Sequence, residues 1–277
     1  MGVAHRRSPI GPGTLLAAAL AVLAQPRPAE AAPDCAAAPS RADVLAGLGP
    51  RGELVLASGA RAVLDGLQWP EDAAVAAAAQ AWLLRHRGRG LTLVARGETD
   101  RWGRTHVDAT VEPDAGTAAP ADAEPADLTG GLVAAGLAQV DAGEGDTLCR
   151  PALLGLEAGA RRAGRGLWSA ASPDVRDGAA LRARMGRFVV TQGRVLWVGE
   201  RARRTYLDFA RKGEDGLTVT VSKRTWRHLQ ERGLSAASLR GREVRVRGRL
   251  EAWRGPTLDV ASADMIEVLD GERAPRR

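Results

Sequence analysis

The residues best suited to binding chemistry are cations placed beside aromatic rings in the second half of the sequence. The segment RARRTYLDFARKG, residues 201–213, surrounds Tyr206 and Phe209 with basic side chains, and a second basic group surrounds Trp226. Single-stranded nucleic acid stacks its bases on aromatic rings while arginines meet its phosphates. The pattern predicts a nucleic-acid site formed by Arg203, Arg204, Tyr206, Arg211, Lys223 and Arg224. The alternative is a solvated arginine-rich face over an ordinary barrel core.

Strand alternation limits how many of these rings can face a ligand. In residues 205–209, Tyr206 and Asp208 fall on one face of a strand, while Phe209 falls on the other. If Phe209 points inward, only Tyr206 remains to stack.

The elements that must position these residues are short strands. Residues 188–198, with Gly193 as a bend, and residues 204–209, 217–221, 244–250 and 257–260 have β-rich or alternating patterns, and a helix is expected at 223–232. Five strands with a helix between the third and fourth follow the order of an OB-type barrel. We therefore expect a basic OB-like domain over residues 182–270.

The first half also predicts strands with helices. Residues 53–57 and 60–64 alternate around Ser58-Gly59 as a hairpin, and strands are expected at 91–95 and 105–111, separated by a turn at 97–103. Helices are expected at 72–86, 128–140 and 151–168, and residues 112–126 form a Pro/Ala-rich loop. The fold class is thus mainly β with α.

Three segments of this half resemble the thermonuclease, or staphylococcal-nuclease-like, family. They are GARAVLDGLQWPE at 59–71, TDRWGR at 99–104, and LVAAGLAQV at 132–140 followed by LLGLEAGARRAGRGLW at 153–168. The resemblance covers about residues 45–169. It implies a five-stranded barrel with three helices, and in active members a calcium-dependent phosphodiesterase.

The resemblance assigns catalytic roles to two residues. Glu71 matches the glutamate that activates water, and Arg104 matches an arginine that stabilises charge on the phosphoryl oxygens. For each a plainer role is open. Glu71 can serve as an acid at a helix N-terminus, and Arg104 can be a turn arginine paired with Asp100.

The family's other functional positions are not matched. Val63 stands at the place of the first arginine, Gln68 at that of a metal-binding aspartate, and residues 50–53, PRGE, at that of the Asp-Gly-Asp-Thr stretch. Arg61 and Asp65 are nearby substitutes. Calcium needs several carboxylate oxygens, so we expect no metal site, no cofactor and little or no phosphodiesterase activity. Calcium would be required only if the nuclease alternative holds.

Cysteines and histidines point to a disulfide and not to zinc. Cys35 and Cys149 are the only two cysteines, and the four histidines show no ligand spacing. We expect a Cys35–Cys149 bridge in an oxidising compartment, with two unpaired thiols as the alternative.

The N-terminus predicts export. Basic residues at 5–7, an apolar run at 15–24 and the small-x-small pattern at 29–31 describe a signal peptide over residues 1–31. No later segment is apolar enough to cross a membrane. A net charge of +6 favours an anionic partner.

These observations favour a periplasmic or secreted, catalytically degenerate thermonuclease-like protein that binds nucleic acid or another polyanion. Two alternatives remain. One is an active calcium-dependent nuclease that uses Glu71 and Arg104. The other is an envelope module that contacts a protein, whose identity the sequence does not indicate.

Overall fold

The computed structural model describes residues 1–2, 35, 39–113, 126–143, 147–211, 213–253 and 255–269. Apart from Met1 and Gly2, the expected signal peptide lies outside the described residues, as does most of the expected loop at 112–126. The chain from Ala31 onward forms one compact unit.

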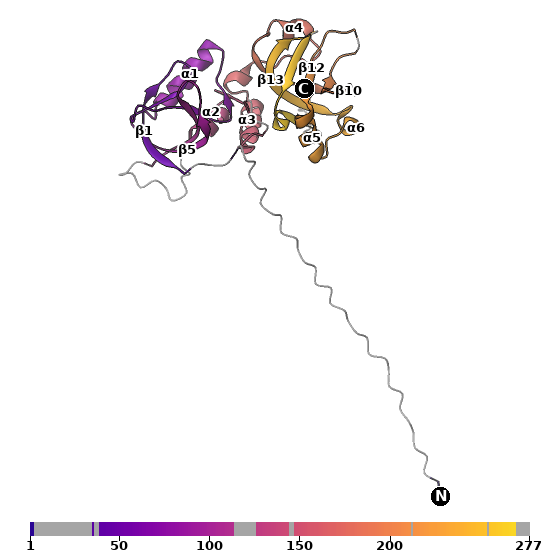
Figure 1. Ribbon diagram of the computed structural model, residues 1–277, viewed down its shortest axis with the longest axis horizontal. Helices are drawn as coiled ribbons and strands as arrows, with labels where there is room; N and C mark the ends of the chain where they lie inside the picture. Colours follow the sequence, from indigo (N-terminus) through magenta and orange to yellow (C-terminus); the bar gives the residue numbers. More distant parts are fainter. Residues whose placement is uncertain are drawn as a thin grey trace. The chain divides into compact units, whose positions relative to one another are not determined.

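The first half of this unit is a closed five-stranded barrel (Figure 1). Its strands are β1 (Arg41–Leu48), β2 (Leu54–Leu56), β3 (Arg61–Leu64), β5 (Gly90–Thr99) and β6 (Arg104–Val111). They follow the order β3-β2-β1-β5-β6, and a parallel pairing of β3 with β6 closes the barrel. The interior is filled by alternate side chains such as Leu91, Leu93 and Val107.

Helices and short strands surround this barrel. Helix α1 (Ala73–Leu84) begins at Asp72, whose carboxylate accepts hydrogen bonds from the amides of Ala74 and Val75. The remaining elements are β4 (Leu67–Gln68), β7 (Ala126–Asp127), α2 (Leu128–Ala134), β8 (Gln139–Val140), α3 (Ala152–Arg162) and the 3-10 turn η2 (Gly166–Ser169). The expected hairpin and the three helices are confirmed.

Several expected boundaries in this half are wrong. The helix predicted over 128–140 ends at Ala134, because residues 139–140 instead form β8 and pair with β4. The helix predicted over 151–168 ends at Arg162, and a 3-10 turn follows. Strand β1 is an element that the sequence analysis missed, and β5 runs on to Thr99 into the expected turn.

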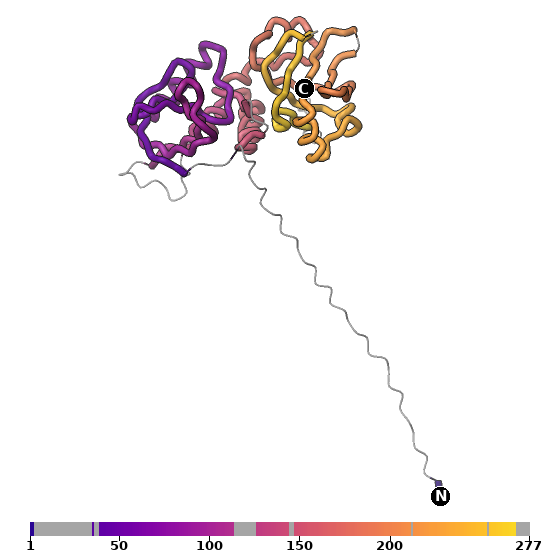
Figure 2. The backbone as a smooth tube through the Cα atoms, in the orientation of Figure 1, coloured from indigo at the N-terminus to yellow at the C-terminus, as the bar shows by residue number. Residues whose placement is uncertain are grey.

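The second half is a curved sheet with OB strand order, drawn from orange to yellow in Figure 2. Its strands are β9 (Phe188–Arg194), β10 (Trp197–Glu200), β11 (Arg204–Asp208), β12 (Thr218–Ser222), β13 (Glu243–Ala252), β14 (Pro256–Val260) and β15 (Ile266–Val268). The path β10-β11-β12-β14-β13 returns to β9, and β12 lies parallel to β14. The helices are α4 (Gly178–Arg182), α5 (Lys223–Glu231) and α6 (Ala236–Leu239), with a 3-10 turn η3 (Ala263–Met265).

Gly193 does not make the bend expected of it. It pairs with Val244 inside the β9–β13 ladder, and a Cβ on it would lie 2.3 Å from a methyl carbon of Val175. The break between β9 and β10 falls instead at Val195 and Leu196. The glycine is therefore needed for close packing.

Both halves have the same connectivity. Counting β9 and β10 as one interrupted strand, the third strand of each half pairs in parallel with the fifth, β3 with β6 and β12 with β14, and a helix, α1 or α5, precedes the fourth strand. This is the arrangement expected of an OB-type barrel. The fold class, mainly β with helices, is confirmed for a closed five-stranded barrel and a second OB-like sheet.

A buried ion pair joins the two halves. Arg247 of β13 donates to Glu157 of α3, and both side chains are almost fully excluded from solvent. Glu157 also accepts a hydrogen bond from the backbone amide of Val140 at 2.8 Å. Elsewhere between the halves, the amide of Leu148 donates to Asp264 at 2.7 Å.

Candidate nucleic-acid interface

Three aromatic rings lie on the outer face of the second sheet. Tyr206 of β11 stacks on Trp253, which follows β13, with ring centroids 6.0 Å apart and an interplanar angle of 17°. Trp197 begins β10. Trp197 is 51% exposed and Trp253 49%. Large exposed rings are unusual on a soluble barrel and supply flat surfaces for a planar ligand.

The strand register explains why these side chains share a face. Trp197 pairs with Asp208, and Asp208 pairs with Thr218 of the next strand. Leu207 and Thr205 of β11, and Phe209 directly after it, are buried. The expectation that Phe209 would be unavailable for stacking is confirmed, because alternation turns it into the core.

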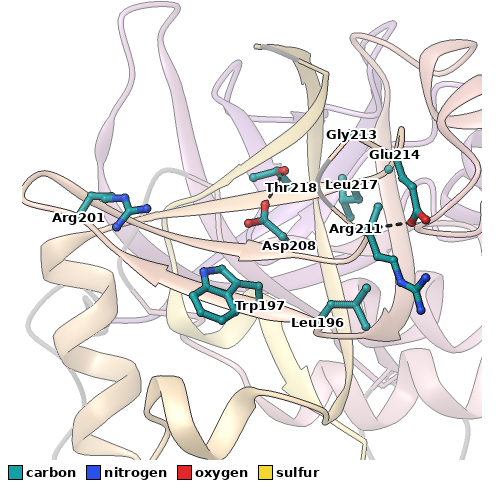
Figure 3. A pocket seen from close by; sticks show the side chains of 11 residues that line it. Leu196, Trp197, Arg201, Asp208, Arg211, Gly213, Glu214, Leu217 and Thr218 are labelled. Atoms are coloured by element: carbon teal, nitrogen blue, oxygen red, sulfur yellow. Dashed lines mark hydrogen bonds between the residues drawn. The ribbon is translucent and has the colours of Figure 1, made fainter.

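Hydroxyls and carboxylates form the floor between the rings. The hydroxyl of Thr218 donates to Asp208 at 2.9 Å (Figure 3). On the neighbouring row Asp259 accepts from Thr220 at 3.0 Å and is ion-paired with Arg204. The hydrogen bond that Arg204 donates to Asp259 raises the pKa of Arg204 above its ordinary value. The charge of Arg204 is thus already balanced.

The face is hollowed into three adjoining depressions of about 650, 390 and 450 Å³. Trp197 lines the first two, and Tyr206 and Trp253 line the last two, so the depressions are continuous. Among the residues that the structure describes, the charged lining consists of three arginines and five carboxylates: Arg201, Arg204, Arg211, Asp208, Glu214, Asp215, Glu251 and Asp259. The floor is therefore not positive, and phosphate contacts must come from arginines at the rim.

Two turns supply those rim arginines. Arg201 and Arg203 belong to the turn between β10 and β11, and both are exposed. Arg211 lies in the connection between β11 and β12, where its amide donates to Glu214 at 3.0 Å. Arg240 stacks on Trp197, with its guanidinium carbon 4.6 Å from the ring centroid. Cations thus border the aromatic face on several sides.

The structure brings only part of the predicted set together. Arg204, Tyr206 and Arg211 line the depressions, and Arg203 lies in the adjoining turn. Lys223 and Arg224 begin helix α5 and line none of the three, and the Lys223 ammonium donates instead to Thr205 at 3.3 Å. Trp226 is buried and donates to Glu200 at 3.0 Å.

Sequence reasoning missed Trp197, Trp253 and Asp208 as members of the site. Asp208 was placed on the face of Tyr206 by alternation, but Trp197 lies on the preceding strand and Trp253 follows β13, and only strand pairing brings them to this face. The sequence offered one signal for these two residues: each tryptophan lies near the end of an expected strand, beside residues that a barrel would place on its outer face.

In the first barrel, Glu71 is held by cations of the second sheet. Arg249 donates to one of its carboxylate oxygens at 2.9 Å, and Arg187 lies 3.7 Å from the other. Asp72, and not Glu71, caps α1. Within the described part of the chain, no hydrogen bond or ion pair joins Glu71 to Arg104.

Arg104 is held by acids of its own barrel. Its guanidinium pairs with Asp100 at 2.8 Å and lies 3.5 Å from Glu53, which also lies 3.7 Å from Arg61. Burial by itself raises the pKa of Glu53, but hydrogen bonds from backbone amides and the charges of Arg61 and Arg104 outweigh it and lower that pKa. The expected pairing of Arg104 with Asp100 is present, and Arg104 is the first residue of β6 and not a turn residue.

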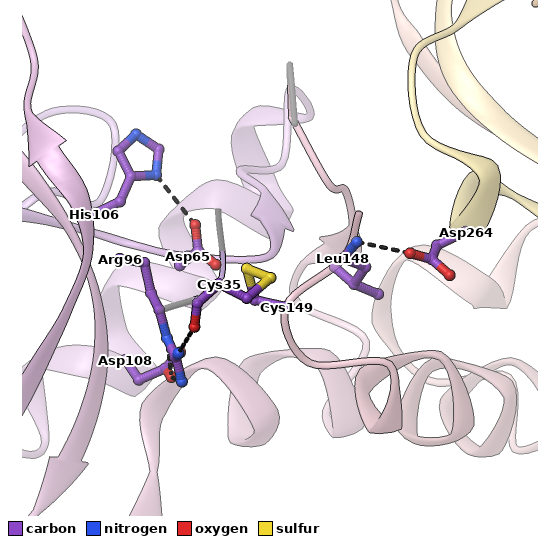
Figure 4. Close-up of a disulfide and its surroundings, with 8 residues drawn as sticks. All are labelled: Cys35, Asp65, Arg96, His106, Asp108, Leu148, Cys149 and Asp264. Carbon is purple, nitrogen blue, oxygen red and sulfur yellow. Dashed lines mark hydrogen bonds and ion pairs between the residues drawn. A yellow bond between two sulfur atoms is a disulfide. The ribbon is translucent and has the colours of Figure 1, made fainter. Parts of the chain in front are cut away.

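A disulfide and an Asp–His pair lie beside one another on this barrel (Figure 4). The Cys35–Cys149 bridge is present, and Arg96 donates to the carbonyl of Cys35 at 2.7 Å. His106 Nδ1 lies 3.4 Å from Asp65, and that hydrogen bond raises the pKa of His106. The expected bridge is confirmed.

Neither a metal-ligand cluster nor a membrane-spanning helix is found in the part of the chain that the structure describes. No group of three or more His, Cys, Asp or Glu side chains there is arranged to hold a metal ion. None of the helices there combines the length and the apolarity that crossing a bilayer requires.

Comparisons with known proteins give a likeness only to solved structures. No protein-family model and no curated protein matches the chain. It is similar to OBody AM3L09 bound to hen egg-white lysozyme, at 23% identity over 33% of this chain and 91% of that chain, with a TM-score of 0.26. It is also similar to OBody AM1L10 bound to hen egg-white lysozyme, at 25% identity over 33% of this chain and 89% of that chain, with a TM-score of 0.26. The OB-like assignment of the second sheet therefore rests on its strand order.

Proposed function

We propose that this chain is an exported, non-catalytic binding protein that holds single-stranded nucleic acid on the outer face of its second barrel. The observation that carries the proposal is the trio Trp197, Tyr206 and Trp253, bordered by arginines on an OB-type face. The face of the second and third strands, with the loops that flank it, is where OB barrels bind oligonucleotides and oligosaccharides.

The arrangement divides a bound strand into two zones. Bases would stack on the three rings, each stacking contact contributing about 1–3 kcal/mol. The backbone would follow the rim, where Arg201, Arg203 and Arg211 meet its phosphates. Because carboxylates line the floor, a phosphate there would be repelled, and the rim is the favourable path for it.

The first barrel supports a non-catalytic role. At the positions where it resembles thermonucleases, Glu71 is neutralised by Arg249 and Arg187, and Arg104 by Asp100 and Glu53. With its carboxylate oxygens engaged by two guanidinium groups, Glu71 is poorly placed to activate a water molecule, and an arginine paired with carboxylates has less charge to offer a phosphoryl group.

An apolar ring lies against the segment that resembles the metal-binding stretch. A Cβ on Gly52 would lie 2.2 Å from the Trp69 ring, so the indole lies directly against the segment that resembles the metal-binding stretch. Gln68, at the place of a metal-binding aspartate, donates to the carbonyl of Trp69 at 2.9 Å. This packing favours a structural role for the residues around the former site.

Export is part of the same proposal. The N-terminal pattern predicts a signal peptide, and the Cys35–Cys149 bridge suits the periplasm or the extracellular medium, where disulfides persist.

The test is fluorescence anisotropy with a labelled single-stranded DNA of mixed sequence. We expect binding that weakens with salt, with a slope of about −2 if three arginines each neutralise one phosphate at about 0.7 per contact. Trp197→Ala and Trp253→Ala should each weaken binding by roughly 5- to 150-fold, the range given by 1–3 kcal/mol per stacked base. Trp102→Ala, which removes a 58% exposed tryptophan from the first barrel, is the matched control.

Absence of binding at low salt would refute the proposal, and so would equal losses in all three variants. A nuclease assay with calcium is run beside it. Calcium-stimulated digestion that Glu71→Gln abolishes would establish the enzyme alternative and overturn the non-catalytic assignment.

A further inference from the structure

One carboxylate on the aromatic face differs from its neighbours. Asp208 lines two of the three depressions and lies between Trp197 and Thr218 in Figure 3. Among the described residues its carboxylate accepts one hydrogen bond, from the hydroxyl of Thr218, and makes no ion pair. Asp259, by contrast, is paired with Arg204. Asp208 therefore presents a negative charge and unused acceptor positions to the depression.

The strand register places that acceptor beside a stacking surface. Trp197 and Asp208 are directly paired residues of two antiparallel strands, which puts their Cβ atoms about 4.5–5.5 Å apart. A base that stacks on the exposed indole would thus bring one of its edges over the carboxylate. Thr218 pairs with Asp208 from the neighbouring strand β12. Its hydroxyl donates a hydrogen bond to the Asp208 carboxylate and so orients that carboxylate.

An ionised carboxylate only accepts hydrogen bonds, so it distinguishes bases by their donors. Cytosine, adenine and guanine carry an exocyclic amino group that donates to such an acceptor, and aspartate accepting from cytosine N4 is an established pairing in base recognition. Thymine and uracil present two carbonyl oxygens around a single N–H. Those oxygens would face the charge of Asp208 unfavourably.

We propose that Asp208 is a specificity-determining residue that makes the face prefer bases with an exocyclic amino group over thymine or uracil. This inference rests on the proposed function and deepens it. The rings supply affinity that is nearly independent of sequence. Asp208 adds the dependence on the base edge.

The experiment compares oligo(dC) with oligo(dT) of equal length on the full chain, by anisotropy in mildly alkaline buffer. Because one good base contact discriminates by about 1–3 kcal/mol, we expect oligo(dC) to bind roughly tenfold more tightly than oligo(dT). Asp208→Asn should reduce that ratio to near one, because an amide both donates and accepts. Its oxygen still accepts from Thr218, which keeps the local structure.

The matched control is Glu214→Gln, which removes the same charge from the same depression but at the connection that follows β11. It should change the affinity for both oligonucleotides equally and leave their ratio intact. A ratio lost in both variants would overturn the role of Asp208, since charge alone would then explain the preference.

The remaining outcomes separate this inference from the proposed function. Equal binding of oligo(dC) and oligo(dT) by the wild type refutes the specificity while leaving nucleic-acid binding in place. Binding of neither refutes the proposed function. Displacement of both by a neutral oligosaccharide would overturn both, because aromatic rings beside carboxylates and hydroxyls also suit a sugar chain.

Discussion

The buried pair Arg247–Glu157 should carry a large share of the stability of this chain. The Arg247 side chain is 0% exposed and that of Glu157 1%, so neither charge has water to replace a lost partner. Removing one member of a buried pair typically costs about 3–5 kcal/mol, because the other remains buried and uncompensated.

The perturbation is Arg247→Met, which keeps an unbranched side chain at this position and removes the guanidinium and its charge. Glu157 would retain the hydrogen bond from the backbone amide of Val140. Its other cation in the structure, Arg161, lies 4.0 Å away. We expect the free energy of unfolding to fall by about 3–5 kcal/mol in urea titrations followed by tryptophan fluorescence. The double variant Glu157→Leu with Arg247→Met should recover part of that loss, since it removes the stranded carboxylate, and Glu267, the other partner of Arg247, keeps Arg245 at 3.6 Å. Recovery is incomplete because Arg161 loses Glu157 as its partner.

The control is Arg182→Met, which breaks the half-exposed pair with Asp215. Exposed pairs contribute about 0–1 kcal/mol, so this variant should unfold almost as the wild type does. If Arg247→Met costs no more than Arg182→Met, the buried pair does not stabilise the joined barrels, and the reasoning fails. The reasoning also fails if the double variant Glu157→Leu with Arg247→Met is less stable than Arg247→Met alone.

Three further predictions concern the first barrel. Cys35→Ser should lower the free energy of unfolding by about 2–5 kcal/mol, because the bridge spans 114 residues, and reductant should leave that variant's urea midpoint unchanged while lowering the wild type's. Gly52→Ala should cost about 1–3 kcal/mol more than Gly59→Ala: both glycines have positive φ, but only at Gly52 would a Cβ collide with a ring. Equal urea midpoints for the two variants would disprove that. Asp65→Asn should lower the pKa of His106 in an NMR titration, because the hydrogen bond that His106 donates to the Asp65 carboxylate raises it. A folded pKa above the unfolded value of about 6.5 means that the pair stabilises below that pH and stops doing so as pH rises through the folded value. The variant should therefore lose more Tm in mildly acidic than in alkaline buffer, and an unchanged titration would contradict the contact.

Local patterns were enough to predict most elements of both barrels. The alternation around Ser58-Gly59 and along residues 204–209 gave strands with the correct inward faces, because a period of two is a property of the chain alone. Asp72 marked the start of α1 because a capping carboxylate acts on amides two and three residues later. The helix boundary at 134 was wrong because the pairing of β8 with β4 joins distant segments.

The sequence by itself determined where most strands lie along the chain and which of their residues face outward, since both follow from local periodicity. It also indicated the cysteine pair, although only the structure showed that the two meet. Tertiary structure alone decided which charges are free. Glu71 and Arg204 read as available groups in the sequence, but partners more than fifty residues away neutralise them, Arg249 for one and Asp259 for the other. The site therefore changed from a basic segment to an aromatic face, because an ion pair depends on distance in space and not on spacing along the chain.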